Sequence, residues 1–316
     1  MIATTLSAPT RANGPPGSPL VLEGLEPDNL LAFLALLGLL RALETAKPEW
    51  QPRVVWCEMP MAAELHLTTS ADAQDMVAAA DAGIRQLGRA YDFDRADITY
   101  KPEDFRRFAA KSANDRERAM LVAALASDGA ARRDGDTVEP TSLCAMFGQG
   151  HQHFLSRLAG MAVRDDAANV SDLSRALFEP WRYEDYTDGF RWDPMEDRRY
   201  AHQYGDPSEN RNQIGTVTGA NRLATIGFSA LVSAPTSSGL ATLGVAGTRR
   251  ERNVCWPLVA VQTSLVGYLA LLAHPWLGDD VKASALAAYG VRGIARARRY
   301  KVGKFFNYER ALIQVL

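Results

Sequence analysis

The chain has 316 residues, 47% of them hydrophobic, a share that predicts a self-supporting globular fold with a sizeable core. Its formal net charge of -2 excludes binding to a polyanion through the charge of the whole chain, so any such contact must come from local clusters. The three cysteines, Cys57, Cys144 and Cys255, lie far apart without a CxxC pair, and predict reduced thiols in a cytoplasmic protein.

The first elements predict a leader, a strand and a buried helix. Residues 1–18 lack the hydrophobic segment of a secretory signal and are expected to form a flexible leader. Residues 19–25 alternate like a short strand, and a helix is predicted over about 28–46 with Asp28 as its N-cap. Its apolar run, 30–40, is too short to cross a bilayer, which takes roughly 20 residues. This helix is therefore expected in the core.

The rest of the first half predicts further helices and short strands. A β-hairpin that packs on the first helix is expected around Pro60, and a solvent-facing helix or helical pair after Pro102. The ranges are 53–59 and 62–68 for the hairpin, 71–90 for a helix, 96–100 for a β-type run and 102–127 for the helical pair. The turn-rich stretch 128–140 is the expected boundary between an N-terminal α+β part, 19–135, and a C-terminal part, 136–316.

The C-terminal part predicts helices on both sides of a long irregular loop, and then strands. Helices are expected over 151–164, 171–181, 220–232, 264–273 and 280–289, and strands over 240–247 and 253–261. The central loop covers 180–219, and a basic tail covers 291–310. The whole pattern predicts an α+β fold, helix-rich, with short and mostly antiparallel strands.

Motifs for catalysis and metal binding are missing from the sequence. His151 and His153 lie two residues apart, whereas two ligands on one helical face need i, i+4 spacing. Carboxylates of the central loop alternate with arginines, which favours ion pairing. A phosphate loop at Gly303-Lys304 would need its first glycine where Arg298 stands and a Ser or Thr where Phe305 stands, and no GxSxG elbow is present. We therefore expect no catalytic residue, metal or cofactor.

The basic tail is the clearest local charge feature. Its arginines and lysines alternate with Tyr300, Phe305 and Phe306, a mixture that suits phosphate contact together with stacking on bases. A solvated basic face is the alternative. The nucleic-acid contacts predicted in this tail are Arg296, Arg298, Arg299, Lys301 and Lys304.

The central loop offers a different set of groups. Its second half is rich in amide and guanidinium side chains that hydrogen-bond to base edges, spaced by glycines. The predicted contacts are Asn210, Arg211, Asn212, Gln213, Asn221 and Arg222. A polar loop held by its own Asx turns is the alternative. The first half is expected to anchor the loop on the core through Trp192, Asp193, Asp197 and Tyr200.

Two segments resemble a known family. "LVLEGLEPDNLLAFLALLGLLRALE", 20–44, resembles the strand, glycine and helix with Gly-Leu-Leu that open several CRISPR-associated proteins of type I systems. "RWDPMEDRRYAHQYGDPS", 191–208, with "GANRLATIGF", 219–228, resembles the signature of a small large-subunit-like protein of type I-G (formerly I-U) Cascade surveillance complexes. Helicase and HD nuclease motifs are missing, so DNA cutting is expected from another chain.

The resemblance implies a non-catalytic subunit of an RNA-guided effector complex in antiviral defence. Such a subunit contributes to target-DNA binding, recognition of the flanking motif (PAM) and recruitment of the helicase-nuclease. The implied partners are the other Cascade subunits, guide RNA, double-stranded target DNA and the helicase-nuclease, with no membrane. The matching positions are Arg191, Asp193, Asp197, Arg198, Arg199, Gly219, Asn221 and Arg222, and the motif does not state whether they touch nucleic acid.

Two other classes of function stay open. One is a metal-dependent nuclease that uses the carboxylates between Glu184 and Asp197 together with His151 or His202. The other is an assembly protein whose surface binds only other subunits.

Overall fold

The computed structural model describes residues 18–58, 61–132, 135–146, 153–185, 189–196, 215–248, 251–302 and 305–316. Within these residues, helices are combined with short strands that pair only antiparallel. The α+β fold predicted from the sequence is confirmed. Nearly all of the predicted leader, residues 1–17, lies outside the described residues.

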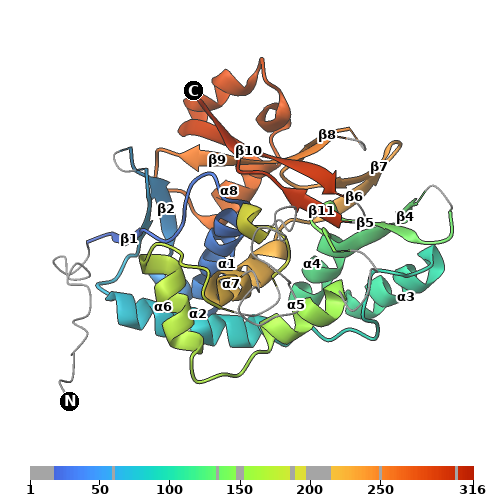
Figure 1. Ribbon diagram of the computed structural model, residues 1–316, viewed down its shortest axis with the longest axis horizontal. Helices are drawn as coiled ribbons and strands as arrows, with labels where there is room; N and C mark the ends of the chain where they lie inside the picture. The colour runs from blue at the N-terminus through green and yellow to red at the C-terminus, as the bar shows by residue number, and fades with distance from the viewer. Residues whose placement is uncertain are drawn as a thin grey trace, which may run out of the picture.

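Two helices form the centre of the molecule, α1 (Leu30–Ala46) and α7 (Thr218–Phe228) (Figure 1). Leu30 to Leu43 of α1 are all buried, so the predicted core helix is confirmed. Its N-cap is Asn29 and not the neighbouring Asp28 that was expected, because the Asn29 Oδ1 accepts a hydrogen bond of 2.9 Å from the Leu31 N–H.

Glycines set the distance between these two helices. A Cβ added to Gly38 of α1 would lie 1.8 Å from the Leu223 carbonyl oxygen of α7, and one added to Gly227 would lie 2.0 Å from the Leu34 carbonyl oxygen. Only glycine allows the backbones to approach this closely. The close contact between α1 and α7 therefore depends on a glycine at one position of each helix.

The other helices surround this pair. In Figure 1, α2 and α5 lie below α1 and α7, α6 lies to their left, and α3 and α4 lie to the right. Their bounds are α2 (Ala73–Gly88), α3 (Pro102–Ser112), α4 (Arg116–Leu125), α5 (Phe154–Ala162), α6 (Asn169–Phe178) and α8 (Leu265–Leu272). The 3-10 helices within the described residues are η1 (Pro48–Trp50), η2 (Pro194–Glu196), η5 (Pro275–Gly278) and η6 (Ala283–Tyr289). The predicted helices are all found, although 280–289 is a 3-10 helix and 96–100 holds no strand.

The main sheet lies above α1 and α7 in Figure 1. It has the order β11-β10-β9-β8, with β12 paired to the same edge of β10 as β11. Its strands are β8 (Val245–Gly247), β9 (Arg252–Val259), β10 (Val291–Val302), β11 (Phe305–Tyr308) and β12 (Leu312–Val315). The segment predicted as a basic tail is thus mostly a central strand, whose Ala295 pairs with Trp256 of β9.

Smaller sheets complete the fold. The predicted hairpin around Pro60 is found as β2 and β3, and β1 joins it at the β3 edge. The strands are β1 (Leu20–Leu22), β2 (Arg53–Trp56), β3 (Ala63–His66), β4 (Ala126–Ala131), β5 (Val138–Pro140), β6 (Ser233–Thr236) and β7 (Gly239–Thr242). β4 pairs with β5 and β6 with β7.

One hydrophobic core contains residues of both predicted parts of the chain. The stretch 128–140, expected as a boundary, contributes to the β4–β5 hairpin, and α1 from the first part packs on α7 from the second. The division at residue 135 stays a prediction. Of the described helices, none has the length and apolar character needed to cross a membrane.

Candidate nucleic-acid interface

Some of the predicted site residues lie within the part of the chain that the structure describes, and others lie outside it. Outside the described residues lie Asn210, Arg211, Asn212, Gln213 and Lys304, together with the predicted anchors Asp197 and Tyr200. The described ones are Asn221, Arg222, Arg296, Arg298, Arg299, Lys301, Trp192 and Asp193. They lie in three different environments: the buried helix α7, the buried end of the central loop, and strand β10.

Asn221 and Arg222, predicted as base contacts, are fully buried on α7. The Asn221 Nδ2 donates to Thr216 Oγ1 at 2.8 Å, and the Arg222 Nη2 donates to Asp81 Oδ1 at 3.0 Å. Burial lowers the pKa of Arg222, while the Asp81 carboxylate opposes this shift. Neither side chain reaches solvent, so both belong to the core and not to a surface that could contact nucleic acid. This corrects the prediction for these two residues.

Trp192, predicted as a loop anchor, is enclosed by aromatic rings. Its ring stacks on Phe190 at 4.4 Å between centroids and on Phe228 of α7 at 5.9 Å. Its Nε1 donates to the Leu143 carbonyl oxygen at 2.8 Å, which satisfies the polar end of the buried indole. The side chain has no exposed surface.

Asp193 and Glu196 belong to a buried cluster that we call the carboxylate junction: Asn29, Tyr183, Asp193, Glu196 and Thr216. Asp193 Oδ2 accepts hydrogen bonds from Asn29 Nδ2 at 3.1 Å and from the Tyr183 hydroxyl at 3.2 Å. Glu196 Oε1 accepts from Thr216 Oγ1 at 2.6 Å. The junction thereby joins the N-cap of α1 to the residues on both sides of 197–214.

Burial gives the junction unusual acid–base properties. It raises the pKa of Glu196 to about 7, and the neighbouring charge of Asp193 acts in the same direction. The hydrogen bond from Thr216 and one of 2.6 Å from the Arg191 N–H to Glu196 Oε2 oppose the shift. Desolvation raises the pKa of Asp193 as well. The sequence had suggested Glu196 only as one carboxylate among several in the loop.

Two arginines on one face of β10 are neutralised by carboxylates. The Arg298 guanidinium forms a bidentate pair with Glu309, with Nε to Oε2 at 2.9 Å and Nη2 to Oε1 at 2.6 Å. The Arg296 Nη1 lies 3.0 Å from Asp280 Oδ1. A fork-to-fork pair such as that of Arg298 uses the donors that would otherwise bind a phosphate.

The other face of β10 changes from apolar to cationic along the strand. Ala295 and Ala297 are buried there, and Arg299 and Lys301 follow on the same face because side chains alternate along a strand. The Arg299 guanidinium carbon lies 3.6 Å from the centroid of the Phe306 ring, and the Lys301 Nζ lies 5.9 Å from the same centroid. We call this set the Arg299–Phe306 stack.

Arg299 differs from Arg296 and Arg298 because, among the described residues, no carboxylate forms a salt bridge with it. The Nε atoms of Arg299 and Arg296 are both buried without a hydrogen-bond partner. Burial lowers the pKa of Arg299. Glu139, a carboxylate whose charge acts on Arg299, accepts a hydrogen bond of 2.9 Å from Arg252 Nη2.

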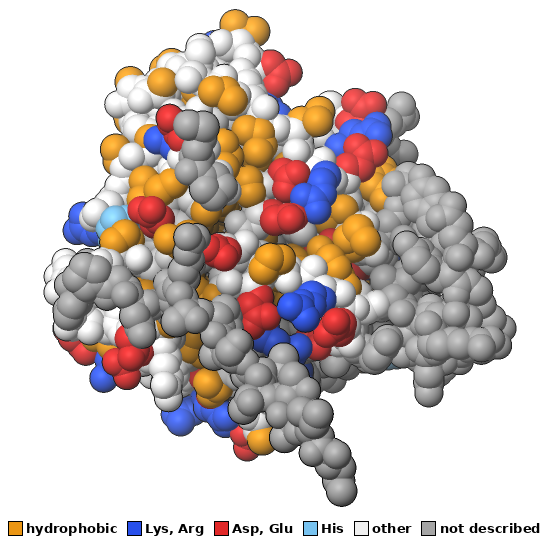
Figure 2. Space-filling model, turned by 60° about the vertical axis from the view of Figure 1, so that its left-hand side comes forward, with side chains coloured by type: hydrophobic (Ala, Val, Ile, Leu, Met, Phe, Trp, Pro, Cys, Tyr) orange, Lys and Arg blue, Asp and Glu red, His pale blue; other side chains and the backbone are white. Residues whose placement is uncertain are grey.

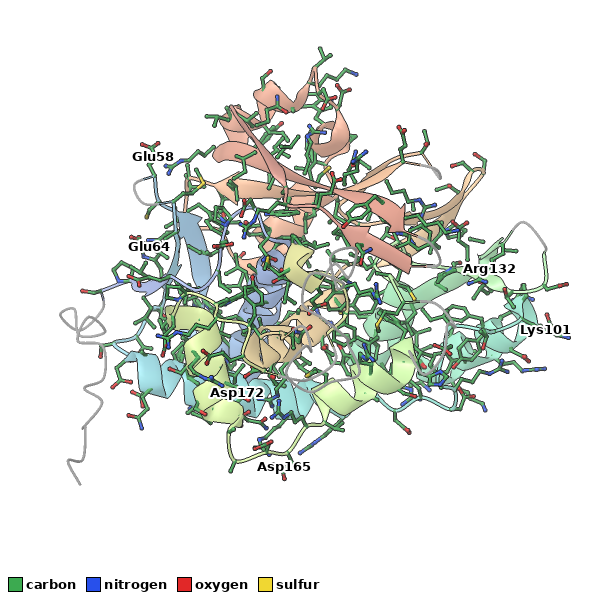
Figure 3. The ribbon with its side chains drawn as sticks, in the orientation of Figure 1. Glu58, Glu64, Lys101, Arg132, Asp165 and Asp172 are labelled. Carbon is green, nitrogen blue, oxygen red and sulfur yellow. The ribbon has the colours of Figure 1, made fainter. Side chains whose placement is uncertain are left out.

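Ion pairing is common elsewhere on the described surface. Figure 2 shows Lys and Arg side chains beside Asp and Glu side chains on the face that it presents. In Figure 3, Asp172 lies on α6 and Asp165 on the connection that precedes it. Asp172 holds Arg175 at 2.7 Å and Asp165 holds Arg85 at 2.6 Å. Arg299 is a partly buried arginine for which the described residues provide no such carboxylate.

The buried thiols and the arrangement of the carboxylates bear on catalysis and metal binding. Burial raises the pKa of Cys144 to about 12 and that of Cys255 to about 11, so both thiols are protonated at neutral pH. Among the residues that the structure describes, there is no cluster of three or more His, Cys, Asp or Glu side chains that could hold a metal ion. No family model matches this chain, and no curated protein matches it.

Proposed function

We propose that the chain is a non-catalytic subunit of an RNA-guided type I CRISPR effector complex in the cytoplasm, similar to the small large-subunit-like protein of type I-G loci. It contributes to target-DNA binding, to recognition of the flanking motif and to recruitment of the helicase-nuclease. Its partners are the other Cascade subunits, guide RNA and double-stranded target DNA.

The packing of the two segments that carry the resemblance is the main support for this proposal. They are separated by about half of the chain, yet α1 and α7 are in backbone contact at Gly38 and Gly227. The Asn29 side chain at the start of the first segment donates a hydrogen bond of 3.1 Å to Asp193 in the second. Two segments that resemble one family are expected to pack together if the chain shares the fold of that family. The two segments do pack together in the core, so the resemblance concerns one continuous part of the structure.

Different residues are proposed for phosphate contact and for base recognition. Arg299 and Lys301 supply positive charge for the phosphate backbone, which positions a nucleic acid without reading its sequence. Asn212 and Gln213 of the central loop remain the proposed groups for base edges, because amides form bidentate hydrogen bonds with adenine. Asn221 and Arg222 have no part in this contact.

Affinity purification with the products of neighbouring genes tests the proposal. The tagged chain is co-expressed with the effector subunits and a guide RNA, and we expect all of them to elute together at low salt. Recovery of the chain alone, with every partner present, would contradict the proposal. Cleavage of DNA by the purified chain with Mg²⁺ or Mn²⁺ would favour the nuclease instead, and a complex unable to bind any DNA would favour the assembly protein.

A further inference from the structure

We infer that the Arg299–Phe306 stack, with Lys301 beside it, is a binding site for the phosphate backbone of a nucleic acid. The inference deepens the proposed function and rests on its nucleic-acid contact. The inference places the nucleic-acid contact on one face at the end of β10. Arg296 and Arg298 are excluded from it because each already forms a salt bridge with a carboxylate.

The geometry of the stack prepares Arg299 for a phosphate. A guanidinium 3.6 Å from the centroid of an aromatic ring is in direct contact with the ring face, which limits its rotation. Its Nε is buried, so a phosphate would be bound through the terminal Nη1 and Nη2 donors. A planar fork held in this way binds a phosphate through two parallel hydrogen bonds at little further loss of side-chain freedom.

The charge of Arg299 also needs an anion. The side chain is partly buried, and burial penalises its charged form more than the nearby charge of Glu139 favours it, so its pKa is lowered. Arg252, which is also buried, has Glu139 as its partner at 2.9 Å. A bound phosphate would give Arg299 a negatively charged hydrogen-bond acceptor, as Glu139 does for Arg252.

The Phe306 ring decides between phosphate contact and base stacking. Tail aromatics were expected to stack on bases, but the ring face of Phe306 is covered by Arg299. A base has no access to that face, so the ring serves to orient the cation. Lys301 is exposed and adds a second charge within reach of a neighbouring phosphate. Repeated phosphates along one strand can therefore engage both cations, and the contact is independent of base sequence.

Titration of the full-length chain with a fluorescently labelled oligothymidylate tests the site. We expect Arg299→Ala to weaken binding about tenfold, since a charge-assisted hydrogen bond is lost. It should also reduce the slope of log affinity against log salt by about one. Lys301→Ala should reduce the slope by a similar amount. The matched control, Arg298→Gln with Glu309→Gln, removes a neighbouring pair without changing net charge and should bind like the wild type.

The outcomes separate this inference from its rivals. Equal weakening in the control would overturn it, as would competition by polyglutamate as strong as that by unlabelled oligonucleotide, which would indicate an acidic protein partner. Arg299→Lys keeps the charge but loses the fork, and binding equal to the wild type would also overturn it. Because Lys301 is exposed, its variant tests the site even if Arg299→Ala does not fold.

Failure of the proposed function gives a different result. If the chain does not copurify with effector subunits but Arg299→Ala still weakens oligonucleotide binding, the phosphate site stands and the complex does not. If copurification succeeds and both Arg299→Ala and Lys301→Ala bind as the wild type does, the complex stands and the phosphate site is overturned.

Discussion

The carboxylate junction and the Arg299–Phe306 stack both place charged side chains away from water, but they treat the charge differently. At the junction, Asp193 receives hydrogen bonds from Asn29, Tyr183 and the Met195 N–H, so its oxygens are satisfied by the protein itself. At the stack, Arg299 contacts a ring, its Nε has no hydrogen-bond partner, and no described carboxylate forms a salt bridge with it. Hydrogen bonds from the protein satisfy the oxygens of the buried Asp193, whereas the partly buried Arg299 has donors that an external anion could satisfy.

The largest effect that would test this distinction is expected at Trp192, next to the junction. Trp192→Ala removes a fully buried ring and leaves a cavity, so the free energy of unfolding should fall by about 3–5 kcal/mol. Met195→Ala, at a half-exposed residue of the same segment, should change it by less than about 0.5 kcal/mol. Urea denaturation measures both. A Trp192→Ala protein of wild-type stability would show that the ring does not anchor the segment.

Glu196 predicts a pH dependence of stability. Its pKa is raised to about 7 in the folded protein, so the folded state binds the proton more tightly than the unfolded state does. The resulting stabilisation is complete below the unfolded pKa of 4.5 and is lost as the pH rises through about 7. We expect a loss of up to about 3 kcal/mol between these limits.

Denaturation curves across that pH range, for the wild type and two variants, measure this contribution. Glu196→Gln should flatten the pH dependence, whereas Glu184→Gln, at an exposed carboxylate, should leave it unchanged. A Glu196→Gln protein that keeps the wild-type slope would place the titrating group elsewhere.

Asp193→Ala should have a smaller effect. It leaves Asn29 Nδ2, the Tyr183 hydroxyl and the Met195 N–H without their acceptor, and we expect a loss of about 1–3 kcal/mol in the free energy of unfolding. The affinity of the folded variant for oligonucleotides should equal that of the wild type. Weaker oligonucleotide binding without a loss of stability would indicate that the carboxylate junction contacts nucleic acid. It would contradict the assignment of that contact to Arg299 and of a structural role to the junction.

The sequence predicted the elements better than it predicted their burial. Leucines throughout 30–43 indicate a helix covered on all sides, and α1 is one. Strand β10 was interpreted as a basic tail because arginine dominates its composition. Its period-2 pattern, with Ala295 and Ala297 between Ile294, Arg296 and Arg298, is the signal that could have identified a strand.

The candidate site depended on contacts that the sequence does not display. Arg222 is polar and lies next to glycine and asparagine, so it suggested a surface, but its neighbours in space are Asp81 of α2 and the core. The pairing of Asn29 with Asp193 joins residues 164 positions apart. Similarly, the sequence around Arg298 and Arg299 does not show which of them has a carboxylate partner. Antiparallel pairing places Glu309 beside Arg298 on one face of the hairpin and Phe306 beside Arg299 on the other face.

A binding titration over a library of flanking sequences, at low and at physiological salt, tests the central claim most directly. In the proposed function, the chain holds a nucleic acid through phosphates at Arg299 and Lys301 and reads bases from the central loop. Arg299→Ala should weaken binding by one factor for every sequence and lower the salt dependence, with a slope change of about one. Asn212→Ala should cost about 1–3 kcal/mol for the preferred flanking motif and little for a poor one. A change of preference in Arg299→Ala, or a uniform shift in Asn212→Ala, would contradict this assignment of the two surfaces.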